Sequence, residues 1–219
     1  MTMTVDIRDE RFRDIVGDGV EFETIASGCL FTEGPLWHAR DGYLLFSDMP
    51  GNHLRKWTPR DGVTTFRKPS NQSNGLAWDP QGRLLNAEHG SGALTRWTPE
   101  GGREVLTECY DGKHLNSPND VVVRSDGMIF FTDPPYGLGE RKSEVGFSGV
   151  YALDESSGRM VLIDGSLSRP NGLAFSPTEA QLYVGDTATQ TLWAYDIAAD
   201  GSASAKRLVI DLKVEGLSG

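Results

Sequence analysis

The amino-acid sequence predicts an all-β fold, a β-propeller with about four blades. Four stretches share one pattern: a polar residue opens a short apolar run, and a turn leads to a second apolar run that closes on an acid. The spacing from opening residue to closing acid is 14 or 15 residues in each stretch. A third short apolar run follows each acid, and successive stretches begin 41, 45 and 52 residues apart. Short strands repeated at this period and joined by tight turns are typical of propeller blades.

Helical solenoids have repeats of similar length, so they are the fold to exclude. They need apolar residues at positions i, i+3 and i+4 over ten or more residues. The apolar runs of this chain are shorter and are rich in β-branched and aromatic residues, which favour strands. The repeats therefore indicate sheets rather than helix pairs.

The expected elements begin with an N-terminal arm. Residues 1–20 form this arm, with one helical turn near residues 12–16, and the β-propeller domain covers residues 21–219. Residues 22–26 are expected to form a strand that leads into the first blade.

Each blade is expected to begin near its opening polar residue. The four opening residues are Glu33, Asn74, Asn119 and Asn171. The first three strands of the successive blades are expected at residues 33–37, 44–48 and 54–57, at 74–78, 84–88 and 94–97, at 119–123, 129–133 and 149–152, and at 171–175, 182–186 and 191–194. Glycine in the connecting turns supplies the positive φ that tight hairpins need.

Two segments depart from the repeat. Residues 134–148 are rich in glycine and charge and separate the second and third strands of the third blade, where a loop of that length is often functional. After an outer strand expected at residues 208–212, residues 214–219 have the composition of a linker. We therefore expect C-terminal blades to be missing from this chain, which would leave apolar faces exposed on the first and fourth blades and would allow the chain to be inactive on its own.

Composition argues against several classes of function. The formal net charge is −10 and the pI is about 4.8, which argues against a nucleic-acid-binding surface. No apolar run reaches 18 residues, so we expect no membrane span. The N-terminus lacks the apolar core of a signal peptide, so the expected location is cytoplasmic.

The opening residues form a candidate metal site. The innermost strands of a propeller surround its axis, so the first polar residue of each strand is expected to face a shared centre. Glu33 supplies a carboxylate and the three asparagines supply amide oxygens, a hard-oxygen set that suits Ca²⁺ or Mg²⁺ better than a soft metal. The four histidines show no zinc-binding spacing, and no Gly-x-Ser-x-Gly elbow is present.

Four motifs in order carry a resemblance to a known family. They are FTEGPLW at residues 31–37, SPNDVV at 117–122, TDPPYG at 132–137 and RPNGLAFSP at 169–177. With these motifs the chain resembles the SMP-30/gluconolactonase/regucalcin-like (LRE-like) family, in its bacterial gluconolactonase branch, from about Glu21 onward. The resemblance implies a six-bladed β-propeller that opens sugar lactones with a divalent metal in its central channel.

The resemblance also implies roles for single residues. Glu33, Asn119 and Asn171 are the expected metal ligands, and Asn119 is also expected to lie near the substrate. The family's candidate for proton transfer is an aspartate of the fifth blade that no residue here matches, so the catalytic residue is unassigned. Ser117 stands where the animal branch has an arginine, so sugar specificity does not carry over. Ca²⁺ is the expected metal, with Zn²⁺, Mg²⁺ and Mn²⁺ as alternatives.

Other interpretations of these residues stay open. Asn74-Gly75 and Asn171-Gly172 are also typical of type I′ hairpin turns, and Glu33 is also typical of a solvated loop acid. The closing acids are expected to hold turns and neighbouring blades by hydrogen bonds; they are Asp48, Glu88, Asp133 and Asp186. The tryptophans are expected in the core between blades; they are Trp37, Trp57, Trp78, Trp97 and Trp193.

Two classes of function remain. The first is a metal-dependent lactonase, in which the metal polarises a lactone carbonyl and activates water. The second is a propeller that serves as a binding platform without catalysis. A platform does not need a carboxylate and amides at the axis, so the pattern favours the enzyme. The expected partner is a small-molecule lactone: gluconolactone, another aldonolactone or, as an alternative, an unrelated ester.

Overall fold

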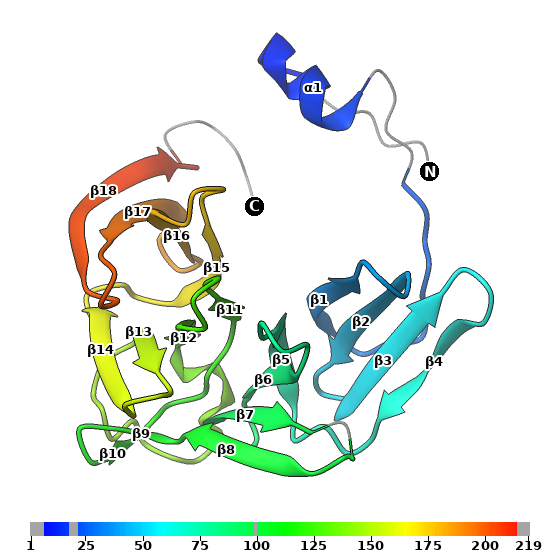
Figure 1. Ribbon diagram of the computed structural model, residues 1–219, viewed down its shortest axis with the longest axis horizontal. Helices are drawn as coiled ribbons and strands as arrows, with labels where there is room; N and C mark the ends of the chain where they lie inside the picture. Colours follow the sequence, from blue (N-terminus) through cyan, green and yellow to red (C-terminus); the bar gives the residue numbers. More distant parts are fainter. Residues whose placement is uncertain (1–6, 18–21, 99, 214–219) are drawn as a thin grey trace.

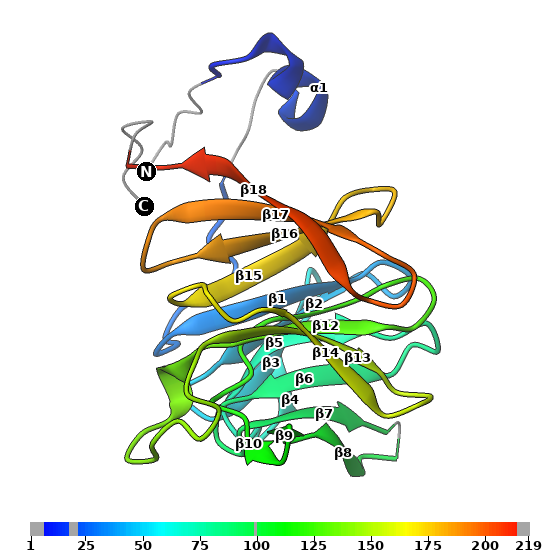
Figure 2. The ribbon, with the colours of Figure 1, turned by 90° about the vertical axis from the view of Figure 1, so that its left-hand side faces the viewer.

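The structure is a computed structural model, and it describes residues 7–17, 22–98 and 100–213 of the 219-residue chain. The described residues form four antiparallel sheets of four strands each, together with one short two-stranded sheet. The sheets follow one another round an arc, as Figure 1 shows, and the predicted all-β propeller fold with about four blades is confirmed. Figure 2 shows the four strands of the last blade lying side by side.

The strands of each blade are consecutive in the chain, and the first strand is the innermost (Figure 1). The first blade contains β1 (Thr32–His38), β2 (Tyr43–Asp48), β3 (His53–Thr58) and β4 (Gly62–Arg67). The second blade contains β5 (Ser73–Trp78), β6 (Leu84–Glu88), β7 (Ala93–Trp97) and β8 (Arg103–Thr107). The third blade contains β11 (Val121–Val123), β12 (Ile129–Asp133), β13 (Gly149–Asp154) and β14 (Arg159–Asp164). The fourth blade contains β15 (Pro170–Phe175), β16 (Gln181–Asp186), β17 (Thr191–Ile197) and β18 (Ala203–Asp211).

A few short elements lie outside the blades. They are η1 (Glu10–Phe12), α1 (Arg13–Val16), the hairpin of β9 (Cys109–Tyr110) with β10 (Lys113–His114), and η2 (Pro135–Gly137). Residues 22–26 form no strand, so that expectation is wrong. The linker expected at residues 214–219 lies outside the described residues. No helix among the described residues is long and apolar enough to cross a membrane.

Glycine closes the tight hairpins as the sequence predicted. Gly42 has a φ of 64° between β1 and β2, and Gly127 has a φ of 94° between β11 and β12. An L-residue with a side chain adopts such a φ only at a cost, so glycine favours the turn at these two positions. After each turn the second strand runs back, so that its last residues lie beside the start of the first strand. The opening polar residues lie at this end, which we call the inner end of the blade.

The hydrophobic core consists of three layers, each shared by two neighbouring blades. Alternate residues of a strand point to opposite faces of its sheet, so Phe131 of β12 packs toward the second blade and Phe130 toward the fourth. The layer between the first and second blades contains Leu45, Leu54, Leu76, Leu84 and Trp97. The layer between the second and third blades includes Leu85, Leu94, Val121, Phe131 and Tyr151. The layer between the third and fourth blades includes Phe130, Val150, Leu173, Leu182 and Val184.

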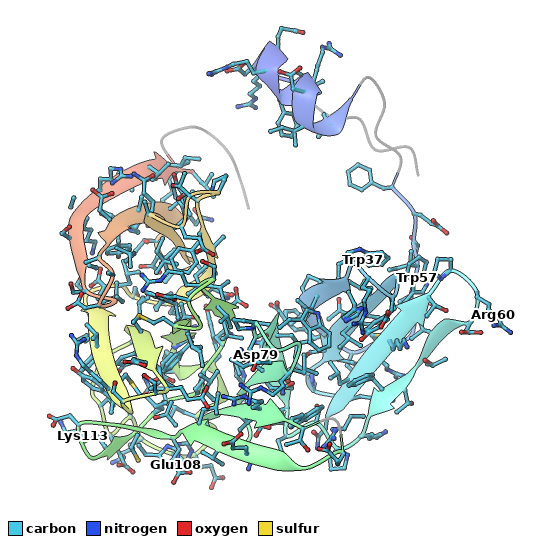
Figure 3. All side chains as sticks on the ribbon, in the orientation of Figure 1. Trp37, Trp57, Arg60, Asp79, Glu108 and Lys113 are labelled. Carbon is cyan, nitrogen blue, oxygen red and sulfur yellow. The ribbon has the colours of Figure 1, made fainter. Side chains whose placement is uncertain are left out.

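Apolar side chains are exposed on the first and fourth blades. Trp37, labelled on the first blade in Figure 3, is 51% exposed, so the expectation that it lies in the core is wrong. Trp97, in contrast, is buried in the layer between the first two blades. The other exposed large apolar residues near the first strand and in the last strand are Leu30, Phe31, Leu208, Val209 and Ile210.

Candidate functional site

The opening polar residues of three blades lie at the same irregularity of the innermost strand. The pairing of the first strand with the second shifts register just after Glu33 in β1, around Asn74 in β5 and around Asn171 in β15. A bulge of this kind redirects the local side chains relative to the regular pleat. Asn74 and Asn171 lie inside strands, so the alternative that their Asn-Gly pairs form hairpin turns is wrong.

The third blade presents Asn119 just ahead of its first strand. Asn119 lies two residues before β11, and its backbone continues the pairing with β12. Asn119 N donates to Thr132 O at 2.8 Å, and Thr132 N donates to Asp120 O at 3.0 Å. Asn119 is buried, and it occupies the place in its blade that Asn74 and Asn171 occupy in theirs.

The backbone carbonyl of each opening asparagine accepts a hydrogen bond from the preceding blade. The three hydrogen bonds run from Ser47 Oγ to Asn74 O at 2.8 Å, from Gly75 N to Asn119 O at 2.7 Å, and from Thr132 Oγ1 to Asn171 O at 2.8 Å. Packing of the blades therefore determines where these three residues lie relative to one another.

Two glycines let the innermost strands approach closely. A Cβ added at Gly34 would lie 2.0 Å from Asn74 O, and one added at Gly75 would lie 2.5 Å from Asp120 Oδ1. Side chains do not tolerate such distances, so close backbone approach requires glycine at both positions. The glycines of Glu33-Gly34 and Asn74-Gly75 thus serve the contact between blades.

His89 brings two of the opening residues together. Its side chain is 2% exposed, and its Nε2 atom lies 3.2 Å from Asn74 Nδ2 and 3.3 Å from Asn119 Nδ2. Burial lowers the pKa of His89 to about 4, so the ring is uncharged at neutral pH. Side chains from the second and third blades therefore meet at one neutral imidazole.

Asp120 links the third blade to the fourth and lies within electrostatic reach of the first. Its Oδ1 accepts from Val121 N at 3.0 Å and its Oδ2 from Leu173 N at 3.1 Å. Burial raises the pKa of Asp120 to about 6, the two N–H donors oppose that rise, and the negative charge of Glu33 adds to it. Glu33 and Asp120 therefore place two acidic groups from different blades at the centre of the arc.

The side-chain oxygens of Glu33 and Asn171 make few hydrogen bonds with other described residues. Both residues are half-buried, and among the described residues the Glu33 carboxylate accepts one hydrogen bond, from Gly34 N at 3.4 Å. Asn171 makes no side-chain hydrogen bond to another described residue, and no shared contact joins its side chain to Glu33 or Asn119. The structure thus joins Asn119 to Asn74 through His89, whereas convergence of Glu33, Asn119 and Asn171 on one point stays a prediction.

The donor chemistry fits a hard divalent cation. Carboxylate and amide oxygens are the ligands that Ca²⁺ and Mg²⁺ take in proteins. Among the described residues no group of three or more His, Cys, Asp or Glu side chains could hold a metal ion. A cation at this place would therefore depend on Glu33 together with amide oxygens rather than on a cluster of acids.

The closing acids hold the segments that lead into their own blades. Asp48, Asp133 and Asp186 each accept hydrogen bonds from two consecutive backbone N–H groups: Leu30 and Phe31, Asn116 and Ser117, and Ser168 and Arg169, respectively. Glu88 has a longer side chain and accepts from the side chains of Asn71, Ser91, Thr95 and Arg103 instead. The expectation that these acids hold turns and connecting segments by hydrogen bonds is confirmed, whereas the further expectation that they hold neighbouring blades is not, because these bonds do not reach the neighbouring blades.

The long loop of residues 134–148 packs against the same end of the second and third blades. Its helical turn, η2, ends at Gly137, whose N–H donates to Ser117 Oγ at 2.8 Å. A Cβ added at Gly137 would lie 2.6 Å from His89 Cβ, so the loop rests directly on His89. The loop therefore closes over the residues that meet at His89 and engages the hydroxyl of Ser117.

His89 and Asp120 were not among the site residues predicted from the sequence. Both lie one position after a residue that the repeat singles out, since His89 follows Glu88 and Asp120 follows Asn119. The available signal was local: a histidine at the inner end of a second strand, and an acid beside a candidate ligand. Neither signal repeats from blade to blade, so the periodicity could not reveal it.

The fold and the site define a β-propeller whose polar residues gather at the inner ends of its blades. The chain belongs to the SMP-30/gluconolactonase/LRE-like family, because the sequence model of the SMP-30/Gluconolactonase/LRE-like region matches residues 31–217. This is a family of gluconolactonase-like lactone hydrolases. The resemblance carried by the four sequence motifs is confirmed.

Curated relatives include two sugar lactonases. The gluconolactonase of Zymomonas mobilis is 38% identical over 95% of this chain and 65% of its own length. The pentonolactonase of Haloferax volcanii is 24% identical over 88% of this chain and 63% of its own length. The chain therefore spans a little less than two thirds of each of these relatives.

Solved structures agree on the fold. A gluconolactonase from Xanthomonas campestris superposes with a TM-score of 0.79 at 35% identity, covering 84% of this chain and 64% of that one. A calcium-binding regucalcin from Agrobacterium tumefaciens superposes with a TM-score of 0.68 at 19% identity, covering 85% of this chain and 61% of that one. The second likeness, at its low identity, supports the fold alone.

Proposed function

We propose that this chain carries the site of a metal-dependent lactonase that opens sugar lactones. Glu33, Asn119 and Asn171 would hold a divalent cation, Ca²⁺ in the first place, and Asn119 would also contact the substrate. The observation that carries the proposal is the shared position of these residues at the inner ends of three blades. The gluconolactonase relatives support a sugar lactone as the substrate class.

The residues of the chain would share the work as their chemistry allows. Glu33 brings the negative charge that a divalent cation needs, and the amides of Asn119 and Asn171 bring neutral oxygens. When bound, the cation supplies a Lewis acid that polarises the lactone carbonyl and makes water easier to deprotonate. Three protein ligands leave room for water and substrate, because Ca²⁺ accepts six to eight oxygens. The proposal takes residues 1–20 as an arm outside the site and residues 21–219 as the propeller domain that carries it.

The packing around Asn119 supports a role in orienting substrate. Its carbonyl is held by Gly75 N at 2.7 Å and its amide nitrogen lies 3.3 Å from His89 Nε2. The first contact holds the backbone of Asn119 and the second holds its side-chain amide, and a residue fixed in this way loses little conformational entropy when it binds a ligand. Asn119 therefore offers its amide oxygen in a fixed place.

The test combines metal binding with turnover. We expect Ca²⁺ binding to the chain by calorimetry, and hydrolysis of glucono-δ-lactone that EDTA abolishes and added Ca²⁺ restores. Glu33→Gln should weaken Ca²⁺ binding by about 10-fold or more, and Asn171→Ala by a smaller factor, because only Glu33 contributes charge. Glu104→Gln, a matched change on the exposed outer strand β8, should leave both measurements unchanged.

A binding platform predicts a different result. A chain that binds a sugar or its lactone without turnover, with the same affinity in EDTA and in the Glu33→Gln variant, would support the platform and contradict the lactonase. Turnover that EDTA and Glu33→Gln both leave unchanged would contradict the metal site while keeping a hydrolase of the same family.

A further inference from the structure

His89 has a place in the site that the proposed ligands do not explain. It follows Glu88 at the end of β6, where the antiparallel pairing with β5 returns the chain to the inner end of the second blade. Its backbone is fixed there, since His89 N donates to Gln72 O at 3.2 Å. The buried ring can therefore contact only the groups that the second and third blades bring to it.

The contacts of the ring determine which of its nitrogens carries hydrogen. Asn74 Nδ2 and Asn119 Nδ2 both approach Nε2, at 3.2 Å and 3.3 Å. An amide nitrogen donates hydrogen bonds and does not accept them, so Nε2 is the acceptor and the ring hydrogen is on Nδ1. His89 thus receives one amide hydrogen bond from each of two blades.

These bonds also orient the two amide oxygens. The nitrogen and oxygen of an amide diverge from its carbon, so a nitrogen held by His89 fixes the direction of its Oδ1 as well. Neither oxygen accepts a hydrogen bond from another described residue. Neither is among the fully buried polar atoms without a partner, so both oxygens are accessible from outside the protein. Both oxygens are therefore available to a cation or to a hydroxyl of the substrate.

We propose that His89 is a positioning residue that fixes the amides of Asn74 and Asn119 with their oxygens toward the ligand. The inference rests on the proposed function and adds His89 and Asn74 to the residues that build the site. Residues behind a metal ligand that set its orientation commonly change metal affinity by 10–100-fold when they are replaced. The direct packing of Gly137 on His89 Cβ keeps the ring in place, so the loop at residues 134–148 supports the same arrangement.

Three variants separate positioning from general stability. His89→Leu removes the acceptor at similar volume, and His89→Gln keeps an acceptor oxygen at a similar distance from the backbone. His53→Leu is the matched control, because His53 is also buried and its Nε2 also contacts a side chain, Thr65 Oγ1 at 2.8 Å, but it does so between β3 and β4, outside the innermost strands.

The first measurement does not involve metal. In ¹⁵N NMR of the wild-type chain we expect His89 to show a protonated Nδ1 and a bare Nε2. We also expect the side-chain amide protons of Asn74 and Asn119 to exchange more slowly than those of exposed asparagines. The slow exchange should be lost in His89→Leu and largely kept in His89→Gln. A protonated Nε2, or amide exchange unaffected by His89→Leu, would overturn the proposal whether or not the chain binds metal.

The second measurement is Ca²⁺ affinity by calorimetry. His89→Leu should weaken binding by about 10-fold or more, and His89→Gln by about threefold or less. His53→Leu should lower the melting temperature without changing the affinity. Equal affinity of wild type and His89→Leu would overturn the proposal. If the wild-type chain binds no Ca²⁺, the proposed metal site fails and the role toward a cation fails with it, while the NMR result still decides whether His89 orients the two amides.

Discussion

At the scale of single residues, Asp133 shows what it costs to bury a carboxyl between blades. It is fully buried and accepts hydrogen bonds from Asn116 N at 2.8 Å and Ser117 N at 2.7 Å. Burial raises the pKa of Asp133 to about 7, because desolvation outweighs the two donors. The ordinary value is 3.8, so the folded chain binds more protons than the unfolded chain between about pH 4 and pH 7. The contribution of Asp133 to stability therefore falls as the pH rises through this window.

This sign can be tested with Asp133→Asn. Asparagine does not titrate, so the free energy of unfolding of the wild type minus that of the variant should fall between pH 4.5 and pH 6.5. The slope should approach about 1 kcal/mol per pH unit, close to the limit for one proton. Urea unfolding at four pH values measures it.

The control for this experiment is Asp200→Asn. Asp200 is an exposed acid whose pKa is lowered by hydrogen bonds from Ser202. Asp200 is ionised in both the folded and the unfolded chain above about pH 5. The free energy of unfolding of the wild type minus that of Asp200→Asn should therefore not change between pH 5 and pH 7. If the free energy of unfolding of the wild type minus that of Asp133→Asn rises with pH, Asp133 is ionised in the folded chain and the prediction is wrong.

At the scale of the strand, the Asn-Gly pairs of β5 and β15 look identical in sequence and differ in their surroundings. A Cβ at Gly75 would lie 2.5 Å from Asp120 Oδ1 and 2.6 Å from Asp120 Cα, whereas one at Gly172 would meet its nearest atom at 3.8 Å. Neither glycine has a positive φ, so backbone conformation alone does not require glycine at either place. Close approach to the next blade makes Gly75 the sensitive position.

We expect Gly75→Ala to lower the free energy of unfolding by about 1–3 kcal/mol, the usual cost of forcing a methyl group into a packed contact. Gly172→Ala should be neutral or stabilising by a few tenths of a kcal/mol, because alanine restricts the unfolded chain more than glycine does. Denaturant midpoints of the two variants against wild type provide the measurement. Equal destabilisation would mean that the strand, rather than the neighbouring blade, requires glycine at this place in the repeat.

The sequence predicted strands well where one pattern recurred. The spacing of opening residues and closing acids located the first three strands of all four blades, because the alternation of buried and exposed residues is local. The bulges were not predicted, since an Asn-Gly pair is equally compatible with a hairpin turn until the pairing partner is known. The core position expected for Trp37 was wrong because burial depends on what packs against the outer face of β1.

The candidate site was predicted in part for the same reason. Glu33, Asn74, Asn119 and Asn171 share a phase in the repeat, and phase is visible in a sequence. The meeting of His89 with Asn119 joins residues 30 positions apart in different blades. That contact depends on how two sheets pack, so no local pattern could reveal it.

At the scale of the whole molecule, stability is distributed over layers between neighbouring blades. Leu45 belongs to the layer between the first and second blades, and Leu182 to the layer between the third and fourth. Both side chains are fully buried. Because each layer is shared by two blades, the arc resembles a repeat protein, in which stability is approximately a sum of unit and nearest-neighbour terms.

This arrangement predicts that damage to one layer stays local. Leu45→Ala and Leu182→Ala should each cost about 2–5 kcal/mol, because each leaves a cavity in a packed layer. In hydrogen–deuterium exchange, Leu45→Ala should accelerate exchange in β1–β8 and leave β15–β18 close to wild type. Leu182→Ala should accelerate exchange in β11–β18 and leave β1–β4 unchanged. The two variants act as controls for each other, since they make the same substitution at equal burial. Equal acceleration in all four blades by either variant would mean that the arc opens as one cooperative unit.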